Sequence, residues 1–270
     1  MKTRSSILRS SFRLLLPTWK YISITAILTL LSFVFLIYHN NLSGISLGDA
    51  FANLSLGMRP VPKFNPQYIF RIPLLWISLY SYLFFSVNAL LRLRPSSYSY
   101  TTLFNLQKRT SYWLMTYLTA IVHIAIHFLT MLLILLFCVL AINGEVTFAL
   151  TPGFIHSFLN GFNTDLTTGM VFVSACLLPF MASTAIAVLE VSLMLFIGAP
   201  QSFLLVVCIL VISAFFDSSL TLGNYLMFLR NETLASMGNS NIIFGLVILF
   251  SYMLLSYIAG MIKIRKSNII

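Results

Sequence analysis

The chain has 270 residues, of which 59% are hydrophobic and only 8% are charged. Soluble domains carry about 25% charged residues, so a soluble globule of this composition would lack the polar groups that cover a water-facing surface. This excludes a soluble α-helical protein and predicts a chain that crosses a membrane several times. The net charge of +10 would suggest nucleic-acid binding in a soluble protein, but in a membrane protein the same excess is expected on cytoplasmic loops.

Residues 1–20 predict an amphipathic helix that lies on the inner membrane surface. A helical wheel separates apolar residues from basic ones, with Arg4 as the exception: Ile7, Leu8, Phe12 and Leu15 against Lys2, Arg9 and Arg13. A cleaved signal peptide is the alternative. The apolar stretch that follows is long for a signal peptide, and no small-x-small cleavage pattern follows Tyr38. We therefore expect the segment to be retained as an interfacial helix.

Six apolar segments are candidates for membrane-spanning helices, each of which needs about 20 mostly apolar residues. Together they predict an all-α, six-helix transmembrane domain over residues 21–270, with spans at about 21–38, 72–91, 112–142, 170–197, 201–216 and 242–262. The third and fourth are longer than the bilayer is thick, so they must tilt, kink or project from it. Pro179 removes one backbone hydrogen bond inside the fourth. Gly198-Ala199-Pro200 predicts a tight turn, so the fourth and fifth spans form a helical hairpin.

The basic residues determine the predicted orientation. With the N-terminus inside, most of the 16 basic residues fall on the cytoplasmic side: Lys2, Arg4, Arg9, Arg13, Lys20, Arg92, Arg94, Lys108, Arg109, Lys263, Arg265 and Lys266. Only Arg59, Lys63, Arg71 and Arg230 fall in outer loops. This bias predicts that both termini are cytoplasmic. The positive charge is then explained by orientation, and no separate basic domain remains to bind nucleic acid.

Familiar catalytic motifs are missing from the chain. It has no G-x-x-x-x-G-K-S/T phosphate loop, no H-E-x-x-H and no G-x-S-x-G, so ATP hydrolysis by that loop and the corresponding hydrolase mechanisms are excluded. The cysteines Cys138, Cys176 and Cys208 lie in apolar runs without C-x-x-C spacing, which indicates packing residues rather than a disulfide framework or a zinc site. We expect no catalytic residue, no metal site and no cofactor in this chain.

Three polar residues within the spans are candidates for function. His123 and His127 are four residues apart, so both rings lie on one helix face, and Glu190 lies in the inner half of the fourth span. An unpaired charge there is costly, so Glu190 should face protein or water, be paired, or be protonated. His123 is the first partner that we expect. A structural polar clamp is the favoured interpretation, ahead of a substrate or proton path and of metal or haem ligation.

Two further sets of residues have simpler interpretations. Asp217 and Arg230 flank the loop after the fifth span, where an ion pair is conceivable but separate solvation at the outer surface is favoured. Trp76, Tyr112 and Trp113 lie near span ends, which is typical of interfacial anchors rather than of a ligand cage. The outer loop 39–71, which contains three prolines, is expected to be irregular.

The basic loop between the second and third spans has a layout of its own. Pro95 ends the incoming helix, and Thr101–Arg109 is compatible with a short helix that has Leu103 and Leu106 on one side. The loop is either a topogenic signal alone or a lever for a soluble partner.

The chain resembles the permease subunit of a type-2 ABC exporter in its six spans, cytoplasmic termini and basic amphipathic helix before the first span. KRTSYW (Lys108–Trp113) and GNYLMFLR (Gly223–Arg230) are similar to segments of Gram-positive permeases that export antimicrobial or amphipathic peptides. The resemblance covers the layout of the full chain, but the motifs cover few residues. The long outer loop 39–71 departs from the pattern, and no substrate residue is transferred.

This resemblance implies that the loop couples the permease to a separate ABC ATPase, which holds the ATP and Mg. The residues to which it assigns this role are Arg92, Arg94, Leu103, Leu106, Lys108 and Arg109. A second permease copy or a paralogue would complete a dimer in the lipid bilayer of a bacterial plasma membrane. The alternatives are a non-catalytic immunity or assembly factor and an intramembrane metal-dependent enzyme that uses the histidines and Glu190. Ion-driven carriers are disfavoured because no inverted repeat is present.

Overall fold

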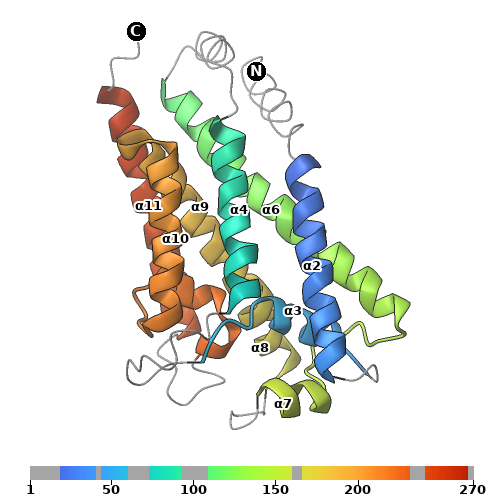
Figure 1. Ribbon diagram of the computed structural model, residues 1–270. Coiled ribbons are helices and arrows are strands. Elements are labelled where there is room, and N and C mark those ends of the chain that lie inside the picture. The colour runs from blue at the N-terminus through green and yellow to red at the C-terminus, as the bar shows by residue number, and fades with distance from the viewer. Residues whose placement is uncertain are drawn as a thin grey trace, which may run out of the picture.

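The computed structural model describes six stretches of the chain (Figure 1), namely residues 19–40, 44–59, 73–92, 109–159, 166–231 and 241–266. Within these stretches the chain forms helices and loops, without a strand. The long helices are α2 Trp19–Asn40, α4 Leu74–Arg92, α6 Arg109–Ala141, α9 Leu178–Ile197, α10 Ala199–Phe215 and α11 Ile242–Lys266. The short ones are α3 Leu47–Leu54, α7 Pro152–Phe158, α8 Thr168–Phe172, the π-helical turn η3 Val173–Leu177, and the 3₁₀ turns η4 Leu222–Leu226 and η5 Phe228–Arg230.

All six predicted spans are helices in the structure, and five are long and apolar enough to cross a membrane. The five comprise α2, α4, α6, α11 and the continuous run from α8 to α9. The sixth, α10, has 17 residues and a length of about 26 Å, slightly less than a bilayer core of about 30 Å. By contrast, α6 has 33 residues and is about 50 Å long. The structure therefore supports a multi-pass membrane protein with five helices that are long and apolar enough to span the membrane, and a shorter sixth apolar helix.

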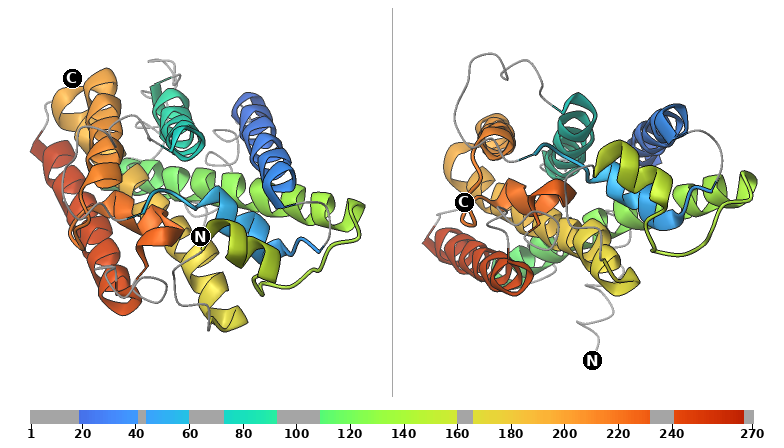
Figure 2. Two further views of the ribbon diagram at one scale, coloured as in Figure 1. Left: turned by 60° about the horizontal axis from the view of Figure 1, so that its bottom comes forward. Right: turned by 90° about the horizontal axis from the view of Figure 1, so that it is seen from below.

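The long helices form two layers. Figure 1 shows α10, α4 and α2 side by side in front, with α9 and the tilted α6 behind them, and α11 packs against α9 and α6. Figure 2 shows the same order from below. At one end of the molecule, which we call the 92–109 end, α4 ends, α6 begins and α9 turns into α10. At the opposite end, which we call the α3 end, the short elements α3, α7, η4 and η5 gather.

The distribution of side chains on α2 is the reverse of that in a soluble protein. Thr25, Thr29 and Ser32 are buried against the other helices, whereas Leu31 and Val34 are more than half exposed. The hydroxyl groups of Thr25 and Thr29 bond within the helix, to the carbonyls of Tyr21 and Thr25. Hydroxyl residues at helix interfaces and apolar residues outside are typical of helices surrounded by lipid.

The proline in the fourth span is accommodated by a local change of helix type. The π-helical turn η3 directly precedes Leu178, so that Pro179 lies in the first turn of α9. Because Pro179 has no N–H, the carbonyl of Ala175 four residues earlier loses its usual partner. That carbonyl accepts a hydrogen bond from the Ser55 hydroxyl, at 3.3 Å. A neighbouring segment thus replaces the missing backbone bond, as membrane helices with proline require.

The expectation that the whole outer loop 39–71 is irregular is wrong. Residues 47–54 form α3, which begins at a capping box of Ser46 and Asp49, and all eight of its residues are buried. Backbone bonds join this segment to residues 143–151, through Leu47 N to Glu145 O at 3.0 Å, and to η5, through Leu229 N to Leu56 O at 3.2 Å. The 44–59 segment therefore links residues 143–151 to η5 at the α3 end.

Trp113 and Trp76 are not interfacial anchors, because both are buried between helices. Trp113 of α6 is fully buried, and its indole N–H donates to the carbonyl of Tyr257 on α11 at 2.9 Å. Trp76 of α4 donates in the same way to the carbonyl of Leu226 in η4, at 3.1 Å. Each indole therefore joins two elements in the interior, and Tyr112 lies half-buried beside the same core.

Candidate functional site

A buried polar cluster joins three of the long helices. It consists of Thr25 on α2, Ser86 on α4, and His123 and His127 on α6, and we call it the histidine cluster. All four side chains are buried, and both imidazoles are completely inaccessible. The two histidines lie on the same face of α6, as their spacing predicts. The cluster is therefore a contact between helices and not a surface site.

The distances within the cluster define a chain of hydrogen bonds. The Nε2 atoms of His123 and His127 lie 3.0 Å apart. The Ser86 hydroxyl oxygen lies 2.8 Å from Nε2 of His123 and 3.4 Å from Nε2 of His127. At the other edge of the cluster, Nδ1 of His127 lies 2.6 Å from the hydroxyl oxygen of Thr25.

Which atom donates in each bond follows from the hydroxyl groups of Ser86 and Thr25, which lie at the two ends of the network. The Ser86 hydroxyl donates to the Leu83 carbonyl at 2.6 Å, so its oxygen accepts from the Nε2–H of His123. Nε2 of His127 faces the same N–H and therefore carries a lone pair, which places the proton of this neutral ring on Nδ1. That Nδ1–H donates to Thr25, whose hydroxyl donates to the Tyr21 carbonyl at 3.3 Å. Both ends of the network thus terminate on backbone carbonyls with both rings neutral.

This arrangement favours the polar-clamp interpretation of the histidine pair. Neutral rings that bond to each other and to hydroxyl groups hold α2, α4 and α6 together without a buried charge, and only Nδ1 of His123 among the four ring nitrogens is buried without a partner. No group of three or more His, Cys, Asp or Glu side chains comes together in the described parts of the chain. Zinc sites use three or four such ligands, and the described residues offer only the two histidines here.

A second polar contact, which we call the Glu190 node, joins α4 to the α9–α10 hairpin. Asn88 Nδ2 lies 2.8 Å from Oε1 of Glu190, 2.8 Å from the Ala199 carbonyl and 3.3 Å from the hydroxyl oxygen of Ser202. Glu190 is completely inaccessible, and its Oε2 has no hydrogen-bond partner. Of the alternatives expected for Glu190, which were contact with protein or water, pairing, or protonation, the structure shows contact with protein.

The expected pairing of Glu190 with His123 is wrong. In the described structure Glu190 bonds to Asn88, whereas His123 bonds to Ser86 and His127. Ser86 and Asn88 are two residues apart on α4, which corresponds to about 200° around a helix of 3.6 residues per turn. The histidine cluster and the Glu190 node therefore lie on opposite sides of α4, and the helix separates the two groups that we expected to meet.

Arg230 and Asp217 are not separately solvated, because Arg230 is fully buried at the α3 end. Its Nη1 lies 3.5 Å from Oδ1 of Asp217, its Nε donates to the Met58 carbonyl at 2.9 Å, and its Nη2 donates to the Ala214 carbonyl at 2.8 Å. Burial lowers the pKa of the guanidinium, and the nearby Asp217 opposes that shift. The side chain joins the 44–59 segment to the end of α10.

Asp49 is a second buried ionisable residue at the α3 end. Its Oδ2 accepts from the Ser46 amide at 3.0 Å and from the Thr151 hydroxyl at 2.7 Å, and its Oδ1 accepts from the Thr151 amide at 3.0 Å. Burial raises the pKa of the carboxyl group above its usual value, and the hydrogen bonds from Ser46 and Thr151 partly counteract this. Asp49 thereby caps α3 and binds it to the segment before α7.

The predicted coupling loop lies almost entirely outside the described residues. The assigned residues that lie outside the described stretches are Arg94, Leu103, Leu106 and Lys108. Arg92 is the last residue of α4 and Arg109 is the first residue of α6, so the loop begins and ends at one end of the molecule (Figure 1). Its proposed role stays a prediction.

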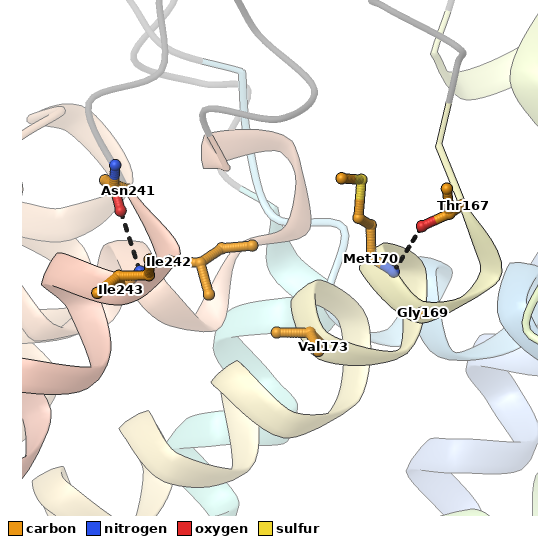
Figure 3. Close-up of a pocket in the computed structure, with 7 residues that line it drawn as sticks. All are labelled: Thr167, Gly169, Met170, Val173, Asn241, Ile242 and Ile243. Atoms are coloured by element: carbon orange, nitrogen blue, oxygen red, sulfur yellow. Dashed lines mark hydrogen bonds between the residues drawn. The ribbon is translucent and has the colours of Figure 1, made fainter.

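An apolar pocket of about 590 Å³ lies between the start of α8 and the start of α11. Its lining residues are Thr167, Gly169, Met170, Val173, Asn241, Ile242 and Ile243. Figure 3 shows that its two polar side chains, Thr167 and Asn241, are each hydrogen-bonded to the backbone of their own segment. Both therefore act as helix caps, and the pocket offers a ligand mainly apolar contact.

Ser86, Asn88 and Thr25 are functional candidates that the sequence analysis did not single out. Asn88 has a recognisable signal, because an amide inside an apolar span needs a partner. Ser86 and Thr25 have none, since hydroxyl groups often bond to their own helix.

None of the protein families, curated proteins or solved structures compared with the chain matches it. Its function is therefore inferred from its own geometry and charge.

Proposed function

We propose that this chain is the membrane-spanning permease subunit of an ATP-driven exporter of peptides or amphipathic small molecules. A separate ABC ATPase would bind ATP and Mg and dock on the loop between α4 and α6. A second copy of the chain, or a paralogue, would complete the permease in a bacterial plasma membrane. The chain itself would be a transport subunit and not an enzyme.

The observation that carries this proposal is the pair of polar contacts on α4. Ser86 joins α4 to α6 and, through His127, to Thr25 on α2, and Asn88 joins α4 to the α9–α10 hairpin. Both lie within the last two turns before Arg92, where the basic loop begins. A displacement of the loop by an ATPase would therefore be passed to helices on both sides of α4.

The distribution of basic residues supports the orientation that this function needs. The last turn of α11 carries Lys263, Arg265 and Lys266, and it lies at the same end of the molecule as the start of α2, the end of α4 and the start of α6 (Figure 1). Basic residues concentrate on the cytoplasmic side of membrane proteins. An ATPase in the cytoplasm would therefore meet the 92–109 end.

Charge reversal in the loop tests the proposal. The chain would be produced with its neighbouring genes, extracted in mild detergent, and assayed for a co-purifying ATPase. We expect Lys108→Glu with Arg109→Glu to abolish co-purification, because two cations at the end of the loop become anions. Arg265→Glu with Lys266→Glu is the matched control, since both side chains are exposed at the end of α11, and it should retain the ATPase.

Because charge reversal can also invert a membrane protein, the orientation of both variants would be checked with a C-terminal accessibility tag. The proposal would be wrong if the wild-type chain bound no ATPase, or if both double variants bound it equally. The first result would favour an immunity or assembly factor. The intramembrane-enzyme alternative would instead require a bound metal that is lost in His127→Ala.

A further inference from the structure

Glu190 is the least compensated of the buried and half-buried carboxyl groups in the described structure. Asp49 accepts three hydrogen bonds, two of them from backbone amides, and Asp217 faces the guanidinium of Arg230. Glu190 accepts one bond, from the neutral amide of Asn88. Its second oxygen, Oε2, is buried without a hydrogen-bond partner. Water cannot replace that partner, because the side chain is completely inaccessible.

Among the side chains that the structure describes, which leave out those of Arg92 and Arg109, no cation compensates the charge that an ionised Glu190 would carry. The elements packed against α9 are α4, α6, α10, α11, η3 and η4. Their described titratable side chains are Tyr80, Tyr82, Tyr112, Tyr117, His123, His127, Cys138, Cys176, Cys208, Tyr225, Tyr252, Tyr257, Lys263, Arg265 and Lys266. None forms a described hydrogen bond or ion pair with Glu190. His123 is engaged with Ser86 and His127, and Nζ of Lys263 lies over the ring of Phe196.

The position of Glu190 excludes compensation by bulk water. It lies seven residues before the end of α9 at Ile197, about 10 Å along the helix axis. A carboxylate that is removed from water without a counter-ion or several hydrogen bonds is strongly disfavoured, and such a group takes up a proton instead. The Asn88 amide is a weak substitute for a hydration shell, since its two hydrogens are shared among Glu190, Ala199 and Ser202.

We propose that Glu190 is a proton-binding site, at which the folded protein holds a neutral carboxylic acid within the membrane at neutral pH. The proton resides on Oε2, because Oε1 accepts from Asn88. The acid then presents a carbonyl oxygen to Asn88, so three neutral acceptors from α9 and α10 surround the Asn88 amide. The bond that holds α4 to the hairpin therefore persists without a buried charge. Glu190 would hold this proton whether or not the chain belongs to an exporter.

Infrared spectroscopy of the full chain in lipid nanodiscs tests this site. The chain contains three glutamates, Glu145, Glu190 and Glu232, so Glu145→Gln with Glu232→Gln leaves Glu190 alone. With isotopically labelled glutamate, we expect this variant to show the carbonyl stretch of a protonated carboxylic acid at neutral pH. The band should be absent from Glu190→Gln. A difference spectrum of wild type minus Glu190→Gln gives the same answer if the double variant fails to fold.

Two results would overturn the site. One is a pair of carboxylate bands for Glu190 at neutral pH with no acid band. The other is a carboxylate whose bands shift when sodium is exchanged for a bulky organic cation, which would identify a bound metal cation as the occupant.

A second measurement compares melting temperatures. Glu190→Gln reproduces the neutral acid and should have the melting temperature of the wild type, whereas Glu190→Ala should have a lower one. A glutamine variant that melts as low as the alanine variant would also contradict the proposal.

Discussion

The Nε2 atoms of His123 and His127 lie 3.0 Å apart, so one N–H and one lone pair must share the space between them. This geometry admits the two neutral rings and disfavours two imidazolium ions, whose N–H groups would meet head-on. The pair is continued by Thr25 on α2 and by Ser86 on α4. Three helices thus depend on the protons of two adjacent side chains.

Removing one ring should weaken this contact. We expect His127→Leu to lower the free energy of unfolding by about 2 kcal/mol, because Thr25 and His123 both lose a buried partner. Thr25→Val removes only the hydroxyl group and should cost about 1 kcal/mol. Unfolding in detergent would be followed by circular dichroism for both variants and for their combination. Because the two residues share one bond, their effects should not add, and strict additivity would contradict the assigned network.

The bonds of Arg230 should matter more than its ion pair. Arg230→Met removes two bonds to backbone carbonyls and leaves the Met58 and Ala214 carbonyls without their donor, and we expect a loss of about 3 kcal/mol. Asp217→Asn should cost about 1 kcal/mol, because Asp217 is 12% exposed and lies 3.5 Å from Nη1. Thermal unfolding of the two variants measures the difference. Equal losses would show that the ion pair dominates.

Asp49 should make stability depend on pH at the acidic end. Its pKa is raised in the folded protein above the usual value of about 4, so the folded state binds this proton more tightly than the unfolded state. The free energy of unfolding should therefore fall as pH rises from the usual value through the raised one, and stay level above it. Unfolding curves across this range measure the slope.

Asp49→Asn is the variant that isolates this contribution. It should abolish the slope and still lower stability by about 1–2 kcal/mol, because an amide nitrogen cannot accept the bonds that Oδ2 receives from Ser46 and Thr151. A persistent slope in this variant would assign the pH dependence to another group.

Gly260 should be intolerant of a side chain. A Cβ atom at Gly260 of α11 would overlap the buried ring of Trp113 on α6. We expect Gly260→Ala to cost about 1–3 kcal/mol through overpacking. Gly169→Ala is the matched control, since nothing lies within 4 Å of a Cβ there, and it should be neutral or slightly stabilising. Thermal unfolding decides the outcome, and equal behaviour of the two variants would contradict the close approach of α6 and α11.

The long helices follow from composition and hydropathy because each is determined by a local run of apolar residues. The boundaries expected from those runs lie within a few residues of the observed ones, as in 170–197 against Thr168–Ile197. Residues 47–54 were missed because α3 is short and is stabilised by contacts with distant segments, such as the Asp49 bonds to Thr151. The burial of Trp113 was missed because an indole near a span end is also suited to the interface.

The sequence by itself determined that the chain is a helical, multi-pass membrane protein, that its basic residues favour one orientation, and that Glu190 would not be left as an unpaired charge in contact with lipid. It also placed His123 and His127 on one face, because that depends only on helical periodicity. The tertiary structure decided which partners they meet. His123 bonds to Ser86 and Glu190 to Asn88 because α4 lies between them, and the rotation of a helix among its neighbours depends on the packing of the whole bundle.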